Sequence, residues 1–100
     1  MIVLSWNCRG LGHPDAVPSL RDLIRHHKPD IIFLCETLCH ANKIEEIRQS
    51  VGYEACFSVD REGRSGGLSL LWKKERFFEI QKYSRNFINV IVKEEVTNQE

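Results

Sequence analysis

No apolar run in this sequence approaches the roughly 18–20 residues that a helix needs to span a bilayer. The amino end, MIVLSWNCRGLG, also lacks the basic start and long apolar stretch of a secretory signal peptide. An excess of charge of one sign is missing too, because 14 basic residues balance 14 acidic ones. We therefore expect an intracellular protein that is neither secreted nor membrane-bound, and any phosphate binding has to be local.

Proline and glycine are scarce, at three and six residues, which argues against disorder, collagen-like repeats and flexible linkers. Hydrophobic residues make up 42% of the sequence and charged residues 28%, which is the balance of a soluble globular protein. A chain of 100 residues has room for one modest core. We expect a single folded domain.

The four cysteines allow three interpretations. In a small secreted protein, the four cysteines (Cys8, Cys35, Cys39 and Cys56) would suggest two disulfides. Without a secretion signal, and with enough aliphatic residues for a core, we expect reduced thiols. The alternative is a zinc site at Cys35, Cys39 and His40, but this spacing does not match a zinc knuckle, and Cys35 lies inside the apolar run IIFLC.

The first part of the sequence has the pattern of a parallel βαβ unit. The short apolar runs at residues 2–6 and 31–35 are typical of buried strands. Between them, apolar residues at helical spacing predict a helix over residues 16–28, which Asp15 can cap and Pro29 ends. A connection of this length favours a parallel crossover between the two strands.

A second helix is expected to start near Asn42 as its cap, with Glu45 reaching back, and to stop at Gly52. After Gly52 the apolar period changes from 3.6 to 2, and residues 53–93 predict an antiparallel meander. The fold class is therefore α/β, a βαβ unit followed by a meander. No closing helix follows, so we expect the sheet to need further strands or a covering layer.

Polar side chains follow both strands of the βαβ unit. Asn7 comes directly after the first apolar run and Glu36 directly after the second, where ligands collect in parallel sheets. A carboxylate at the rim of a core is costly unless it is paired, hydrogen-bonded or metal-bound. Glu36 could cap the following loop, or it could bind Mg²⁺, which takes one or two protein carboxylates and keeps several waters. The spacing of Asn7 and Glu36 alone does not decide between these two roles of Glu36.

The segments SWNCRGLG, KPDIIFLCET and GRSGGLSLLWK occur in this order along the sequence. Together they resemble the amino-terminal part of the endonuclease/exonuclease/phosphatase domain, in the branch found in plant non-LTR (LINE-type) retrotransposons. The resemblance implies a sandwich of two sheets covered by helices, with residues 1–100 as the incomplete amino-terminal portion, about half, of one such domain. It also implies a nuclease or hydrolase that acts on DNA with Mg²⁺ or Mn²⁺, without a small-molecule cofactor, and it makes the nucleus a candidate location.

Within this resemblance, Asn7 matches the asparagine that helps to position the metal-bound phosphate, and Glu36 matches the metal-binding glutamate. Leu38 stands where many relatives have a lysine, which puts the help of a cation there in doubt. The later catalytic groups of the family, including its histidine base, would follow Glu100, and this sequence has no histidine after His40. The resemblance therefore implies that the chain is a fragment of a retrotransposon endonuclease and is inactive alone.

The alternative is a degenerate module that folds, or binds nucleic acid, without hydrolysis. Phosphatases and abasic-site nucleases share the same early motifs. We expect ordinary structural roles for the other candidate residues: His13 as a turn residue and not a base, Trp6 and Trp72 in the core, and Gly66 and Gly67 in a hairpin bend. A further group of basic residues would contact a phosphate backbone only if its members shared one face, and we expect them instead to serve solubility. These residues are Arg9, Arg61, Arg64, Lys73 and Lys74.

Overall fold

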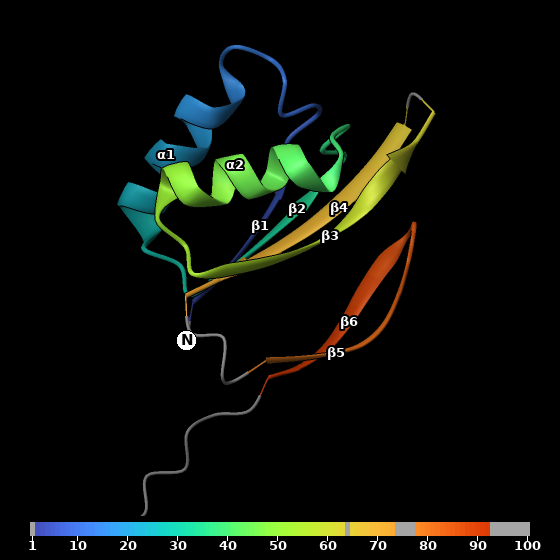
Figure 1. The fold of residues 1–100 in the computed structure, drawn as a ribbon. Helices are drawn as coiled ribbons and strands as arrows, with labels where there is room; N and C mark the ends of the chain where they lie inside the picture. Colours follow the sequence, from blue (N-terminus) through green and yellow to red (C-terminus); the bar gives the residue numbers. More distant parts are fainter. Residues whose placement is uncertain (1, 64, 74–77, 93–100) are drawn as a thin grey trace, which may run out of the picture.

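The computed structural model describes residues 2–63, 65–73 and 78–92, which form two helices and six strands in two sheets (Figure 1). The helices are α1 (Ala16–His27) and α2 (Ala41–Val51). The strands are β1 (Val3–Asn7), β2 (Ile31–Cys35), β3 (Ala55–Glu62), β4 (Ser65–Trp72), β5 (Phe78–Ser84) and β6 (Phe87–Val92). Both helices lie on one face of the larger sheet, and the β5–β6 hairpin lies on the other. The mixed α/β class expected from the sequence is confirmed.

The βαβ unit is confirmed. Strands β1 and β2 pair in parallel, from Val3 opposite Ile31 to Asn7 opposite Cys35, and α1 makes the crossover. Helix α1 ends at His27, and its C-cap Lys28 has a left-handed φ of 47°. The proline that follows Lys28 disfavours any continuation of the helix. No helix in the described part of the chain is long and apolar enough to cross a membrane.

The start of α2 differs from the prediction. The helix begins at Ala41, and the side chain of Asn42 bonds the neighbouring Lys43 amide instead of capping. The carboxylate of Asp60, at the far end of β3, accepts a hydrogen bond from the Ala41 amide at 2.8 Å. A residue distant in the sequence thus satisfies the helix end, which local spacing could not reveal. The predicted stop at Gly52 is confirmed, with φ at 81°.

Glu45 also departs from its predicted capping role. Its carboxylate binds the half-buried Arg48 guanidinium through both Nε and Nη2, and Arg48 Nη1 donates to the Tyr53 carbonyl at 2.6 Å and the Glu54 carbonyl at 3.1 Å. The guanidinium holds the pKa of Glu45 at about 2, well below its ordinary 4.5. This pair ties the end of α2 to the start of β3.

Glu45→Gln is expected to make the stability of the chain less sensitive to acid. A carboxyl whose pKa is lowered by folding stabilises above its ordinary pKa of 4.5, and this contribution is lost as the pH falls toward 2. Urea midpoints measured at about pH 6 and about pH 3 should therefore fall further in the wild type than in the variant. An equal fall in both would contradict this role, and Glu46→Gln on the exposed face of α2 is the control.

The larger sheet has the order β1-β2-β4-β3, and β4 pairs antiparallel with both of its neighbours. The β3–β4 and β5–β6 hairpins are confirmed, but the single continuous meander is wrong, because β5 does not pair with β4 and instead forms a separate two-stranded sheet with β6. Strand β4 lies between β2 and β3, and both of its faces are buried. Leu71 packs on the helix side, and Leu70 and Trp72 pack on the other. Alternation along one strand does not indicate which strands pair.

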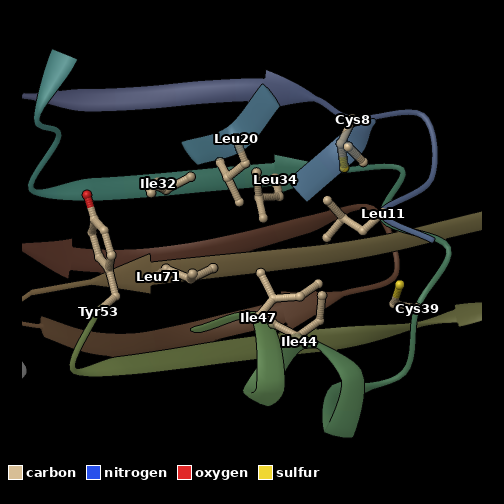
Figure 2. Close-up of a cluster of buried hydrophobic side chains, with 11 residues drawn as sticks. Cys8, Leu11, Leu20, Ile32, Leu34, Cys39, Ile44, Ile47, Tyr53 and Leu71 are labelled. Atoms are coloured by element: carbon tan, nitrogen blue, oxygen red, sulfur yellow. The ribbon is translucent and has the colours of Figure 1, made fainter. Parts of the chain in front are cut away.

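The hydrophobic core has two parts, one on each face of this sheet. On the helix side, Leu20, Leu34 and Ile44 are fully buried, and Figure 2 shows them gathered between the sheet and the helices. On the other side, Ile31, Leu70 and Trp72 pack against partly buried side chains, which are Phe33, Ala55, Phe57, Ile80, Ile88 and Val90. The chain therefore supplies two strands of the covering layer that we expected to be missing.

The second sheet still leaves apolar surface open. Phe87 is 46% exposed, Ile91 42% and Tyr83 60%. Side chains of this type usually face a core, so the two described strands of the second sheet are only partly covered.

Candidate functional site

Asn7 and Glu36 meet at one edge of the larger sheet. Because β1 and β2 run parallel, their carboxyl ends share this edge, and Asn7 is paired with Cys35, the residue before Glu36. The Asn7 side-chain amide donates a hydrogen bond from Nδ2 to Glu36 Oε2 at 2.5 Å. Both residues are exposed to solvent. The structure thus brings together the two site residues predicted from the sequence.

Backbone hydrogen bonds fix the segment that carries Glu36. On one side, the Gly10 amide donates to the Glu36 carbonyl at 2.8 Å, and the Leu11 amide donates to the Thr37 carbonyl at 2.9 Å. On the other side, the Thr37 amide donates to the Gly67 carbonyl at 3.1 Å. The backbone around Glu36 is therefore held from both sides, by the loop after β1 and by the start of β4.

Left-handed backbone is concentrated here. Among the described residues, four that are not glycine have positive φ, and three of them flank this site: Arg9 at 51°, Glu36 at 52° and Leu38 at 55°. Such conformations cost roughly 1–3 kcal/mol each and cluster at functional sites. The fourth, Lys28, ends a helix. The Arg9 amide also donates to Asn7 Oδ1 at 3.2 Å, which fixes the direction of the Asn7 amide group. This strain marks the edge as a candidate site.

The donor chemistry of this pair fits part of a Mg²⁺ or Mn²⁺ site. Glu36 supplies an exposed carboxylate, and Asn7 orients it through Nδ2. Within the described residues, no group of three His, Cys, Asp or Glu side chains could hold a metal ion. Mg²⁺ is compatible with this, because it accepts one or two carboxylates and completes its shell with water and substrate phosphate oxygens. A closed zinc site needs four protein ligands and does not fit.

Hydrogen bonds and burial of their thiols indicate structural roles for Cys8, Cys35 and Cys56. The Cys8 thiol donates to the Cys35 carbonyl at 3.1 Å, and the Cys35 thiol to the Trp6 carbonyl at 3.8 Å. Burial raises the pKa of Cys8 to about 11, so this thiol stays protonated and is a poor metal ligand or nucleophile. Burial likewise raises the pKa of Cys56 to about 11. Of the proposed zinc ligands, His40 instead faces Asp60, with 3.4 Å from its Nδ1 to the carboxylate.

Most other candidate residues have the structural roles expected. The His13 Nδ1 accepts a hydrogen bond from the Asp15 amide at 3.2 Å, a local turn interaction. Trp72 is buried, and Trp6 is half-buried against the helix-side core. The Lys73 Nζ lies 5.6 Å from the centroid of the Tyr53 ring. Of the remaining basic candidates, Arg9 is exposed beside the site, and the side chains outside the described part of the structure are those of Arg61, Arg64 and Lys74.

Gly66 and Gly67 differ from the prediction of a hairpin bend. They lie within β4, with φ of 85° and 95°, and their carbonyls accept hydrogen bonds from Leu38 and Thr37. Thr37 is fully buried although it is polar. The sequence analysis missed the contact of these glycines with Thr37. No local sequence signal indicates this contact, because it exists only once β2 and β4 are paired in the sheet.

Comparisons with known proteins bear on the family and on the fold. The model of the Endonuclease/Exonuclease/phosphatase family matches residues 4–99. Among solved structures, an AP endonuclease from Archaeoglobus fulgidus aligns with a TM-score of 0.60 and 21% identity over 75% of this chain and 28% of that chain. ANGEL2, a 2′,3′-cyclic phosphatase, aligns with a TM-score of 0.54 and 20% identity over 80% of this chain and 28% of that chain. No curated protein sequence matches significantly.

Proposed function

Because the chain belongs to the endonuclease/exonuclease/phosphatase family, whose members generally depend on a divalent metal, we propose that it supplies the Asn7–Glu36 part of a phosphodiesterase site. The observation that carries this proposal is the 2.5 Å hydrogen bond between the two side chains at the carboxyl edge of the parallel strands. Glu36 is the ligand for Mg²⁺ or Mn²⁺, and Asn7 orients its carboxylate and faces the substrate phosphate. An ion held by Glu36 would supply positive charge against the charge that develops on the phosphate.

DNA is the substrate that we propose. The AP endonuclease similarity favours nucleic acid, and the segments SWNCRGLG, KPDIIFLCET and GRSGGLSLLWK favour the retrotransposon branch. The chain aligns with only 28% of each neighbour's length. We propose on this basis that residues 1–100 are the amino-terminal portion of one such domain, in an intracellular protein for which the nucleus is a candidate location.

Among the residues that the structure describes, we identify no side chain placed as the base for hydrolysis. In-line attack on a phosphodiester needs a group that takes a proton from water, in addition to charge neutralisation. Of the histidines considered as bases, His13 is engaged in its own turn. Asn7 and Glu36 bind and orient, but neither is placed to activate water and then stabilise the leaving oxygen. We therefore propose that the chain is inactive until the rest of the domain is present.

Nicking of supercoiled plasmid tests this proposal. The purified chain is expected to leave plasmid intact in Mg²⁺, because groups that act as a unit in catalysis lose most of their effect when any one is missing, commonly about 10³-fold or more. A protein that continues this chain to the length of its structural neighbours is expected to nick it, and chelation of the metal should stop the reaction.

Two outcomes would contradict the proposal. Metal-dependent nicking by the short chain that Glu36→Ala abolishes would show that these residues suffice. A folded, extended protein that binds DNA but does not cleave it would identify a non-catalytic module instead.

A further inference from the structure

Gly67 approaches the segment after β2 too closely for any other residue. A Cβ placed on Gly67 would lie 2.3 Å from Thr37 Oγ1 and 3.0 Å from the Leu38 backbone nitrogen. Contacts of a Cβ below 3.0 Å essentially do not occur in proteins, so Thr37 would have to move by about 0.7 Å, the difference between 3.0 and 2.3 Å. The φ of Gly67, at 95°, also disfavours a side chain.

Thr37 has little freedom to make such a movement. It is fully buried, and its amide and carbonyl are bonded to Gly67 and Leu11. Its Oγ1 accepts a hydrogen bond from the Cys39 amide at 3.4 Å. Because Thr37 follows Glu36 directly, and Glu36 is itself held at a φ of 52°, we expect a displacement of the Thr37 backbone to turn Glu36 as well. The direction of the carboxylate toward Asn7 changes with it.

We propose that Gly67 and Thr37 are positioning residues for the Glu36 carboxylate. The bare Gly67 backbone of β4 packs against the Thr37 side chain and sets the orientation in which Glu36 accepts the hydrogen bond from Asn7. The consequence for catalysis rests on the proposed function, whereas the consequence for the Asn7–Glu36 geometry does not. An error of about 1 Å in a reacting group can reduce a rate by about 10²-fold.

The side-chain amide signals of Asn7 in ¹H–¹⁵N NMR spectra of the chain test the geometric part. In Gly67→Ala these signals are expected to move toward their positions in Glu36→Gln, where the charged acceptor is lost. Gly52→Ala is the matched control, since Gly52 has a φ of 81° but nothing within 4 Å of its added Cβ. It should lose stability through strain and leave the Asn7 signals in place.

A rescue variant separates the contact from general damage. Thr37→Ala in the Gly67→Ala background removes the oxygen that would clash at 2.3 Å, so the Asn7 signals should return toward the wild-type positions. If Gly67→Ala does not fold, Thr37→Ala alone decides. It leaves the contact empty, whereas the added methyl group at position 67 fills it in the double variant, so the single variant should shift the same signals. Unchanged Asn7 signals in every folded Gly67 or Thr37 variant would overturn the proposal.

Kinetics in the extended protein test the catalytic part. Gly67→Ala is expected to lower kcat by about 10²-fold with little change in KM, and Gly52→Ala to leave both unchanged. If the Asn7 signals move but the wild-type extended protein does not cleave DNA, the positioning role stands and the proposed function fails. If the wild type cleaves and Gly67→Ala neither shifts these signals nor lowers kcat, the positioning role fails and the proposed function stands.

Discussion

Glu36→Gln is expected to lower the rate of DNA nicking by about 10³-fold or more in a protein that completes this domain. Glutamine has nearly the same shape and can still accept the hydrogen bond from Asn7, so the loop after β2 should keep its conformation. What disappears is the negative charge, without which Glu36 no longer attracts a divalent cation from its hydration shell. The measurement is the initial nicking rate at saturating Mg²⁺.

Glu46→Gln is the matched control for this substitution. Glu46 is an exposed carboxylate on α2 whose nearest partner is Lys43, with 3.8 Å between Oε1 and Nζ. A surface ion pair of this kind contributes little to stability, so nicking should proceed at the wild-type rate. If Glu36→Gln cleaved as fast as Glu46→Gln, the metal would be held elsewhere and Glu36 would be a structural residue of the loop.

The βαβ unit could be predicted because each of its signals is local. The apolar run at residues 31–35 is bounded by Pro29 and by Glu36, and the run at residues 2–6 ends before a glycine-containing loop. The adjacency of Asn7 and Glu36 then follows from topology, since parallel neighbouring strands end at the same edge. The sequence therefore indicates this pair, and the structure joins its two side chains by a hydrogen bond of 2.5 Å.

The position of β4 between β2 and β3, and the departure of β5 into a second sheet, could not be predicted in this way. Alternation reports which face of a strand is buried, but not which strand lies beside it. The run LSLLW carried a usable signal, because Leu70 and Leu71 are consecutive and are both buried, as in a strand covered on both faces.

The roles of Asp60 and Gly67 were also beyond local patterns. Asp60 caps α2 from a position 19 residues after Ala41, and Gly67 of β4 contacts Thr37, which follows the neighbouring strand β2. Both contacts exist only once the sheet has formed, so spacing within a helix or a turn indicates neither. In each case the local prediction, a cap at Asn42 and a bend at the paired glycines, was plausible and wrong.

Addition of Mn²⁺ to the ¹⁵N-labelled chain tests the central claim, that Glu36 is a metal ligand oriented by Asn7. A single carboxylate gives weak affinity because hydrated divalent ions release water reluctantly, but paramagnetic broadening detects weak binding. The side-chain amide signals of Asn7 should broaden first, together with the backbone amides of Gly10 and Thr37, which lie on the same loops.

The expected result is that these signals disappear during the titration, that excess Mg²⁺ restores them, and that Glu36→Gln leaves them sharp at the same Mn²⁺ concentrations. Glu46→Gln should behave like the wild type. Broadening that persists in Glu36→Gln, or that centres on the exposed pair of His40 and Asp60 instead, would contradict the account and place the metal outside the Asn7–Glu36 edge.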